Sequence, residues 1–503
     1  MRSLSPEFRA YAWAPSTAEL ARRAGLDPSQ IVRFDGNVPP LPLPSSRPAT
    51  VAHALAHVNE YPHGGYPELI AAIAEYAGVG PENVVLGAGG DDLILLVARA
   101  YAGEGDTVAI ADDPTYPLYR VAAGLVGAIV GDDDPVLTFC CRPNNPTGSL
   151  DPLPAARPLA VDEAYIEFAE DDGAAGLIED GVIVIRTFSK AFALAGARVG
   201  YALASADVAA ELNTRQAPLA VATPSAALAL AALASPPDVR AAIEERDRVA
   251  EELRALGYAP LPSRANFLYV PVDDSEALAA RLLARGCVPR VYDDAIRITI
   301  RDREDDDLLL AALAGGDAPA GRSSRHLRAT AETALRIRLR LDGEGRVRVA
   351  TGTGLYDHFL EQLAFHAGLD LVLEGTGDAE TGPHHTAEDS AIALGEALDR
   401  ALGDRRGIAR YGDAVVPMDD ALARAGVDLG GRRASVIELE HDPGLAKHVL
   451  RSLADGGRLC IHVESTGEDP HHVAEAAFKA TGRALRAALR RDGSLVPSTK
   501  GVL

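Results

Sequence analysis

Cysteine is scarce in this sequence, with only Cys140, Cys141, Cys287 and Cys460 among 503 residues. They form no CxxC pair and are irregularly spaced, which fits a reducing compartment better than a disulfide framework. The first ten residues, MRSLSPEFRA, lack the apolar core of a secretory signal, and no apolar run approaches the roughly 20 residues that span a bilayer. We therefore expect a cytoplasmic protein that does not enter a membrane and whose cysteines serve in packing.

Basic residues are fewer than acidic residues, with 49 Lys and Arg against 72 Asp and Glu, so the formal net charge is −23. This charge argues against nonspecific binding to nucleic acid or acidic lipid, although it leaves room for a local basic pocket that binds a phosphorylated metabolite. Hydrophobic residues make up 47% and charged residues 24%, so the chain is not disordered as a whole. Its length exceeds what a single hydrophobic core organises, and we expect two or three domains.

The pattern of apolar runs divides the chain. Residues 80–300 alternate short apolar runs with longer Ala/Leu/Glu-rich helical patterns, which predicts an α/β domain with a mainly parallel sheet. Residues 305–314 read as a capped helix, and a run of small residues with a proline follows. We predict a first domain over residues 1–314, a linker over residues 315–323 and a second domain over residues 324–503.

Histidine usage changes at the same boundary. Ten of the 13 histidines lie at or beyond His326. His358 is followed 26 residues later by HHTAE, and His448 is followed 23 residues later by HHVAE. A duplicated half-domain explains this self-similarity most economically.

The motif RTFSKAFALAGARVGY places Lys190 after an apolar strand and Arg198 eight residues later. A pyridoxal phosphate (PLP) enzyme needs a lysine that holds the aldehyde covalently and later moves protons, together with cations and hydroxyls for the phosphate. Lys190 suits the first role, and Ser189 with Arg198 suits the second. A Ser-Lys pair alone is most often a solvated surface feature, so the motif needs support from elsewhere in the chain.

Two further segments give that support. VDEAYIEF places Asp162 at the end of an apolar stretch, where a carboxylate could pair with the pyridine nitrogen, and Tyr165 three residues later could bond the phenolate oxygen. CRPNNPTG offers Asn145 for the same oxygen from a tight Asn-Pro turn. The three segments in this order, each at a strand end, favour a PLP site over coincidence.

These segments resemble fold-type I aminotransferases, and DEAYIEF with RTFSKAFALAGARVGY is especially similar to histidinol-phosphate aminotransferase, over roughly residues 30–312. The resemblance implies backbone amides of Gly90 and Asp91 at the cofactor phosphate and Tyr116 stacked on the ring. It also implies that Tyr61 reaches the neighbouring subunit's cofactor, and hence a dimer. Arg290 and Arg297 would hold the substrate phosphate.

This half also departs from the family. The stretch between Tyr119 and Cys140 is short, and only about a dozen residues separate PTG from VDEAY, so the domain is compact. These departures leave open that the aminotransferase half is active but has an altered substrate pocket. A phosphate-substrate decarboxylase of the same fold and a different transaminase are the other candidates.

An HHxxE pattern on a helix puts the first histidine and the glutamate on one face, while the second histidine projects about 100° away. One helix could therefore serve two metal centres. A single adjacent pair is usually incidental, but two copies with a preceding histidine each are not. Together they supply six imidazoles and two carboxylates, a donor set that suits Mn(II), although Fe(II), Co(II) or Zn(II) could also bind. These donors are His358, His384, His385, Glu388, His448, His471, His472 and Glu475.

The motifs around these donors resemble imidazoleglycerol-phosphate dehydratase along nearly all of residues 324–503. They are RATAET, TGTGLYDHFLEQLAFH, HHTAED, GIARYG, PMDDAL, HHVAEAAFKA and PSTKGVL. The resemblance implies an α+β duplicated fold like the second domain of ribosomal protein S5, the eight donors as ligands of two divalent metal ions, and Glu388 or Glu475 as the proton shuttle. It also implies residues that bind the substrate, with Glu332 as one contact and the others at its phosphate: Arg410, Arg432, Lys479, Ser498 and Lys500.

The two inferred reactions are consecutive. The dehydratase would convert imidazole glycerol phosphate to imidazole acetol phosphate, which the aminotransferase would convert with glutamate to histidinol phosphate and 2-oxoglutarate. We therefore expect a bifunctional enzyme of histidine biosynthesis that uses PLP and two divalent metal ions. The alternatives are an active dehydratase joined to a diverged PLP enzyme, or one half kept only as an assembly module, since the dehydratase family forms symmetric shells of up to 24 subunits.

Overall fold

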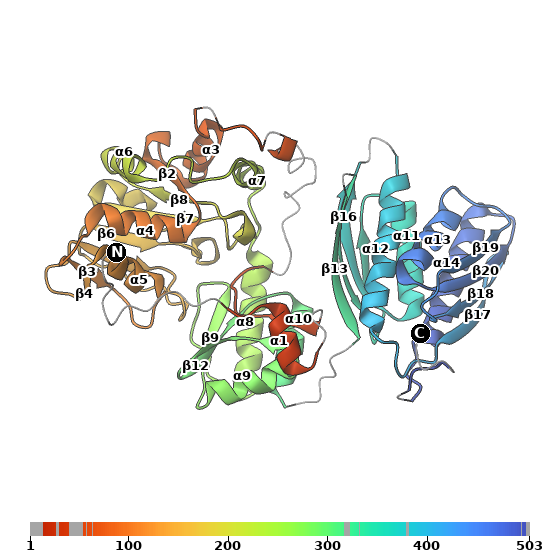
Figure 1. Ribbon diagram of the computed structural model, residues 1–503. Coiled ribbons are helices and arrows are strands. Elements are labelled where there is room, and N and C mark those ends of the chain that lie inside the picture. Colours follow the sequence, from red (N-terminus) through yellow and green to blue (C-terminus); the bar gives the residue numbers. More distant parts are fainter. Residues whose placement is uncertain are drawn as a thin grey trace. The chain divides into compact units, whose positions relative to one another are not determined.

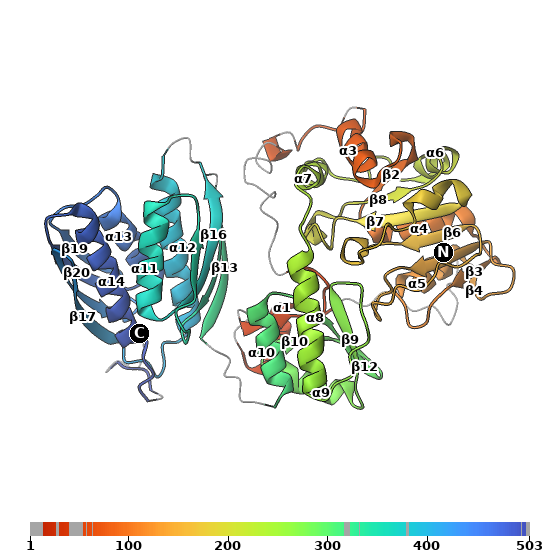
Figure 2. The ribbon, with the colours of Figure 1, turned by 180° about the vertical axis from the view of Figure 1, so that it is seen from behind.

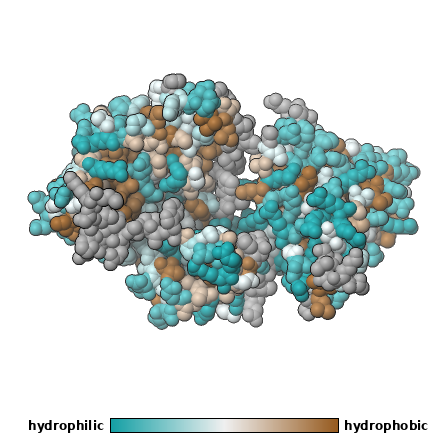
Figure 3. Space-filling model, in the orientation of Figure 1, coloured by the Kyte–Doolittle hydropathy of each residue, from teal (hydrophilic) through white to brown (hydrophobic). Residues whose placement is uncertain are grey.

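The computed structural model divides into two compact units, Met1–Ala318 and Pro319–Leu503, which are described separately. The described residues are 14–26, 30–39, 54–56, 58–62, 64–315, 322–330, 332–378, 382–493 and 495–498. Most of the predicted linker and Lys500 lie outside them. No helix of the described residues is long and apolar enough to cross a membrane. On the face drawn in Figure 3, hydrophobic residues form small, separate patches.

A seven-stranded sheet forms the centre of the first unit (Figure 1). All neighbouring strands in it are parallel except β8, which is antiparallel to both of its neighbours, so the predicted mainly parallel sheet is confirmed. In spatial order the strands are β2 (Val84–Gly87), β8 (Gly200–Leu203), β7 (Val182–Thr187), β6 (Leu159–Asp162), β5 (Leu137–Cys141), β3 (Thr107–Ile110) and β4 (Ile129–Val130).

Helices bury both faces of this sheet, which explains why its strands are almost entirely apolar. On one face lie α4 (Gly90–Tyr101), α5 (Leu118–Val126) and α6 (Ala206–Arg215). On the other lie α3 (Pro67–Ala77) and α7 (Thr223–Leu233). The carboxyl ends of the parallel strands therefore meet at one edge, where side chains from several loops converge.

The unit is compact because one crossover lacks a helix. Residues 142–158 connect the parallel strands β5 and β6, all are described, and none is helical. This loop corresponds to the short interval between PTG and VDEAY.

A smaller layered part completes the first unit. The strands β11 (Arg290–Tyr292), β12 (Ala295–Thr299) and β9 (Phe267–Pro271) form an antiparallel sheet, and β1 (Val32–Arg33) pairs in parallel with β10 (Cys287–Val288). The accompanying helices are α1 (Thr17–Ala24), α8 (Arg240–Ala255), α9 (Ser275–Leu283) and α10 (Arg303–Leu313). Helix α10 begins two residues before the predicted helix because the side chain of Asp302 caps it by accepting from the Asp305 backbone NH.

The second unit contains the same arrangement of strands and helices twice. The first copy runs β13 (Ser323–Ala329), β14 (Thr333–Arg340), β15 (Val347–Ala350), α11 (Leu355–Ala367), β16 (Asp370–Gly377) and α12 (His384–Leu402). The second runs β17 (Tyr411–Met418), β18 (Ala421–Asp428), β19 (Ala434–Leu439), α13 (Ala446–Gly457), β20 (Cys460–Thr466) and α14 (Pro470–Leu489). The sheet orders, β13-β14-β16-β15 and β17-β18-β20-β19, correspond strand for strand.

The four helices of this unit lie between its two sheets, as Figures 1 and 2 show from opposite sides. Helix α11 packs on α14, and α12 packs on α13, so each helix of one repeat pairs with a helix of the other. Glycines permit the close approach. A Cβ at Gly395 would lie 2.5 Å from the Leu453 carbonyl oxygen, and one at Gly482 would lie 2.3 Å from that of Leu363.

Candidate active sites

Lys190 lies on the loop after β7, at the carboxyl edge of the seven-stranded sheet. Its Nζ donates to the Gly36 carbonyl at 3.3 Å and lies 5.6 Å from the centre of the Tyr165 ring. Burial and the nearby Arg297 guanidinium lower the pKa of Lys190 to about 8. A substantial fraction of its amine is therefore neutral near physiological pH, which a nucleophilic lysine requires.

The predicted residues of the first unit, apart from Tyr61, line one cavity of about 330 Å³. Tyr61 is 76% exposed and does not line it. The cavity brings together the following predicted residues: Gly90, Asp91, Tyr116, Asn145, Asp162, Tyr165, Ser189, Lys190, Arg198, Arg290 and Arg297.

Asp162 is the last residue of β6 and is 6% exposed. Burial raises the pKa of its carboxyl to about 6, so the carboxylate still dominates at pH 7. The Tyr119 hydroxyl, from α5, donates to Asp162 Oδ2 at 2.7 Å, and the Ala164 backbone NH donates to Oδ1 at 3.1 Å. Tyr119 was not predicted as a site residue, because only the crossover between strands brings it beside Asp162.

A second group at the cavity combines hydroxyl and guanidinium donors. Ser189 Oγ lies 2.9 Å from Thr187 Oγ1 and 3.5 Å from Arg198 Nη1. Arg198 Nη2 lies 3.2 Å from Asp91 Oδ2. Gly90 begins α4, so backbone NH groups of its first turn and the guanidinium of Arg198 lie at the same cavity.

Gly89, which precedes α4, could not be replaced without strain. Its φ is +87°, and a Cβ there would lie 2.7 Å from Arg198 Nη2. Tyr116 donates from its hydroxyl to Asp91 Oδ1 at 3.0 Å. The side chain of Asp91, and not only its backbone, therefore helps to hold Tyr116 in the cavity wall.

The Tyr165 hydroxyl accepts from two amides, Asn37 Nδ2 at 3.0 Å and Asn145 Nδ2 at 3.3 Å. Asn145 Oδ1 in turn accepts from Arg297 Nη1. Asn37 is 1% exposed and was not predicted, because no motif surrounds it and its role depends on a contact between segments far apart in sequence.

Arg297 and Arg290 are opposite one another on the neighbouring antiparallel strands β12 and β11. Arg297 is 6% exposed, and its Nη2 donates to the Asp35 carbonyl at 2.7 Å. Both guanidinium groups belong to the same cavity wall, which makes it suitable for an anionic substrate group.

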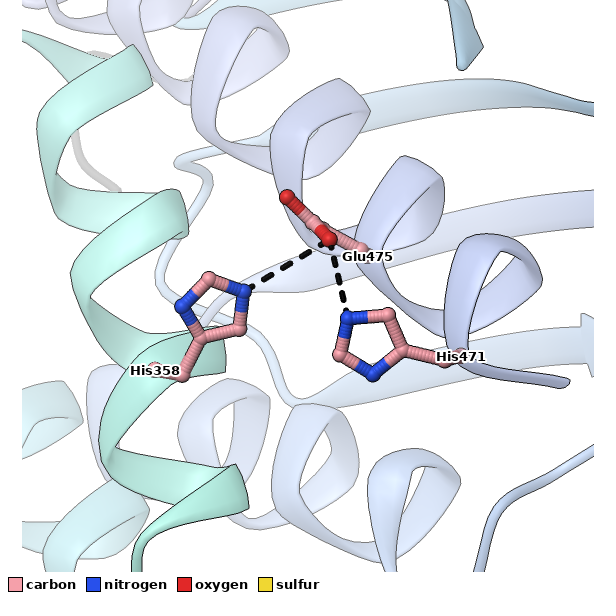
Figure 4. A group of neighbouring side chains, drawn as sticks. All are labelled: His358, His471 and Glu475. Carbon is pink, nitrogen blue, oxygen red and sulfur yellow. Dashed lines mark ion pairs between the residues drawn. The ribbon is translucent and has the colours of Figure 1, made fainter. Parts of the chain in front are cut away.

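In the second unit, His358, His471 and Glu475 form a cluster whose candidate ligand atoms all lie within 4.8 Å of one another. Glu475 Oε2 lies 3.5 Å from His358 Nε2 and 3.1 Å from His471 Nε2 (Figure 4). His358 comes from α11, and the other two come from the first turns of α14. We call this the first cluster.

The second cluster consists of His384, Glu388 and His448. Glu388 Oε2 lies 3.6 Å from His384 Nε2 and 3.3 Å from His448 Nε2. His384 and Glu388 lie on α12, and His448 lies on α13. Each cluster therefore combines donors of both repeats, whereas the sequence pattern grouped the donors repeat by repeat.

The second histidine of each HH pair belongs to neither cluster among the described residues. His385 Nδ1 lies 2.9 Å from Asp378 Oδ2 and 3.7 Å from Glu332 Oε2. His472 Nδ1 bonds Asp420 Oδ1. Their different direction follows from the 100° turn between adjacent helical residues.

The predicted phosphate-binding residues of the second unit are only partly together. Arg410 donates from Nη1 to the Pro497 carbonyl at 2.9 Å, which places it beside the segment that contains Ser498, and also holds Asp428. Lys479 Nζ instead lies 2.8 Å from Glu475 Oε1, at the first cluster. Arg432 is exposed, and Lys500 is outside the described residues.

Comparison with known proteins gives a different family for each unit. The model of aminotransferase class I and II matches residues 29–132 and 132–313, and the model of imidazoleglycerol-phosphate dehydratase matches residues 351–485. An imidazoleglycerol-phosphate dehydratase of Methanococcoides burtonii is 45% identical over 190 residues, covering 36% of this chain and all of that protein. One of Cutibacterium acnes is 43% identical over 201 residues, covering 36% of this chain and 98% of that protein.

A solved structure resembles the first unit. It is the histidinol-phosphate aminotransferase of Sinorhizobium meliloti in complex with pyridoxal 5′-phosphate, with 26% identity and a TM-score of 0.54, covering 60% of this chain and 95% of that one. This agrees with the predicted fold type I. The chain thus belongs to two families, aminotransferase class I and II in its first unit and imidazoleglycerol-phosphate dehydratase in its second.

Proposed function

We propose that the chain catalyses two consecutive steps of histidine biosynthesis. The second unit dehydrates imidazole glycerol phosphate to imidazole acetol phosphate, and the first unit transaminates this ketone with glutamate to give histidinol phosphate and 2-oxoglutarate. The observation that carries the proposal is the presence of both chemical centres in one chain, the Lys190 cavity and the two His/Glu clusters. The relatives of the second unit and the structural neighbour of the first support the two activities.

PLP fits the residues of the Lys190 cavity. When bound, it supplies an aldehyde and a ring that withdraws electrons from the substrate carbon. Lys190 would hold the aldehyde and move protons at its Nζ, and the carboxylate of Asp162 would pair with the protonated ring nitrogen. Ser189, Arg198 and the start of α4 would bind the phosphate, while Tyr165 and Asn145 would orient the phenolate oxygen.

The two clusters fit divalent metal ions of the Mn(II) type, because their donors are imidazole nitrogens and carboxylate oxygens without a thiolate. A bound ion supplies Lewis acidity that stabilises charge on the substrate's imidazole ring. Glu388 and Glu475 are the carboxylates within each cluster that could move a proton. Lys479 follows Glu475 by four residues and forms an ion pair with it. The residue four positions after Glu388 is Ile392, which carries no charge. This difference favours different roles for the two glutamates.

Among the described residues of one chain, each cluster has three donors, and the second histidine of each HH pair contacts other carboxylates. We propose that His385 and His472 complete metal sites together with neighbouring copies, in a symmetric shell of up to 24 subunits. Glu332, near His385, would then contact substrate at such a junction. The exposed Tyr61 fits a separate role at a dimer of the first unit.

Substrate phosphate groups would bind at two places. Arg290 and Arg297 would hold the phosphate in the first unit. In the second unit the phosphate-binding residues would be Arg410, Arg432, Lys479, Ser498 and Lys500, of which Lys479 also contacts the first cluster.

The decisive experiment supplies the purified full chain with Mn(II), PLP, glutamate and imidazole glycerol phosphate, and follows both products by mass spectrometry. We expect histidinol phosphate. Accumulation of the ketone alone would mean that the first unit is not a histidinol-phosphate aminotransferase, and absence of the ketone together with no turnover of added ketone would refute both assignments. Lys190→Ala should abolish only transamination, whereas His472→Ala should abolish only dehydration.

A further inference from the structure

A pocket of about 720 Å³ lies in the second unit, at the end of α11 and α14 remote from the first cluster. Its walls include Phe365 and His366 from the last turn of α11. His366 follows His358 by eight residues, which corresponds to about 12 Å along a helix. The pocket is therefore separate from the metal cluster, although the same two helices carry both.

Two arginines of α14 and the arginine that directly follows this helix line the pocket. Arg483, Arg486 and Arg490 are spaced three and four residues apart, and all three are exposed. Within the part of the chain that the structure describes, none of them forms an ion pair. Two further arginines of the pocket, Arg322 and Arg491, share the single carboxylate of Asp342.

The duplicated fold supplies an internal comparison. Counted from the repeated HHxAE motifs, Arg483 corresponds to Glu396 and Arg486 to Asp399. These two acidic residues line a pocket of about 450 Å³ at the equivalent end of α12 and α13. At these two helical positions one repeat therefore has carboxylates and the other has guanidinium groups. The pocket of about 450 Å³ also contains Asp455 and three arginines, Arg400, Arg433 and Arg458, so its acidic and basic residues are balanced. Compensation of the helix dipole does not explain the arginines, because the equivalent position tolerates Asp399.

The remaining walls contain one more acidic residue, Glu344, which lies 3.0 Å from Arg346, and an aromatic pair. Burial is the main cause that lowers the pKa of His366, and the charges of Lys479 and Arg483 act in the same direction. Phe365 is 58% exposed, and its ring meets that of His366 edge to face at 5.4 Å. The aromatic wall therefore leaves the guanidinium groups accessible to a compact anion.

We propose that this pocket binds a small anion of the polyphosphate class, held by the guanidinium groups of Arg483, Arg486 and Arg490. Guanidinium groups bind phosphoryl oxygens with two parallel hydrogen bonds, so three of them around one pocket match two or more linked phosphoryl groups better than one carboxylate. The proposal does not depend on either catalytic assignment.

The test is isothermal titration of the full, cofactor-loaded chain with inorganic pyrophosphate, with Mg²⁺ in excess. Arg483→Gln with Arg486→Gln should weaken binding at least about tenfold, the loss expected for two charge-assisted contacts. The matched control is Arg400→Gln with Arg433→Gln, which removes the same charge from the equivalent pocket and should bind like the unmodified protein. The heat released when pyrophosphate binds Mg²⁺ is the same in all samples and cancels when the variants are compared.

No binding by the unmodified protein, or equal weakening in both double variants, would overturn the proposal. Thermal melting of each variant checks that it folds. If the first double variant does not fold, Arg490→Gln alone gives the same comparison, since this exposed side chain lines the pocket from the end of the helix.

Discussion

His358 and His471 come from different repeats, yet their rings lie almost parallel, 11° apart with 5.7 Å between centroids. Glu475 faces the Nε2 atoms of both histidines. The second cluster also combines the two repeats, since His448 of the second repeat lies beside Glu388 of the first. Packing of α11 on α14 and of α12 on α13 is therefore what brings the donors of each proposed metal site together.

Glu475→Gln should remove one bound metal ion per chain or lower its affinity at least about tenfold, because a charged ligand is lost from a three-donor cluster. Dehydration should fall accordingly, while transamination should not change. Metal analysis after dialysis, with both assays in parallel, measures the effect. Glu464→Gln, an exposed position on β20, is the control and should retain full metal content.

Tyr119→Phe should reduce the rate of transamination by roughly tenfold, the effect of one hydrogen bond to a charged group. The lost hydroxyl no longer donates to Asp162, so the pKa of this carboxyl rises above about 6 and less of it is ionised at neutral pH. The pH profile of transamination separates this cause from misfolding. A lower rate whose acidic limb does not move to higher pH would contradict the role given to Tyr119.

The capture of PLP should depend on pH through Lys190. Only the neutral amine attacks an aldehyde, so the association rate should rise with pH and level off above about 8, the lowered pKa of this lysine. Stopped-flow absorbance with protein freed of cofactor gives this profile. A rate that continues to rise until about pH 10, the ordinary range for lysine, would show that the cavity does not lower the pKa.

Gly482→Ala should destabilise the second unit by about 1–3 kcal/mol, although alanine is the better helix former. The new Cβ would lie 2.3 Å from the Leu363 carbonyl oxygen, so α11 and α14 must separate. Because these helices carry the first cluster, metal affinity should fall as well. Unfolding followed by calorimetry measures the change, and Gly176→Ala, where a Cβ would meet nothing within 4 Å, is the matched control. Equal stability of the two variants would contradict the close helix packing.

Local patterns in the sequence determined which elements form and which chemistry they carry. Apolar runs followed by Asp162 and Lys190 predicted strands with reactive groups at their ends, and the repeated HHxAE motifs predicted two similar helices with one His and one Glu on a shared face. These features depend on neighbours within a few residues, so the period of a strand or helix is enough to derive them.

Only the tertiary structure decided which of these groups meet. The contact between Tyr119 and Asp162 joins residues 43 positions apart, and Asn37 reaches Tyr165 over 128 positions. The placement of His358 and His448 in clusters with donors of the other repeat likewise arises from helix pairing. A local period specifies the face on which a side chain lies, but the element that covers this face depends on crossovers and packing of the whole unit.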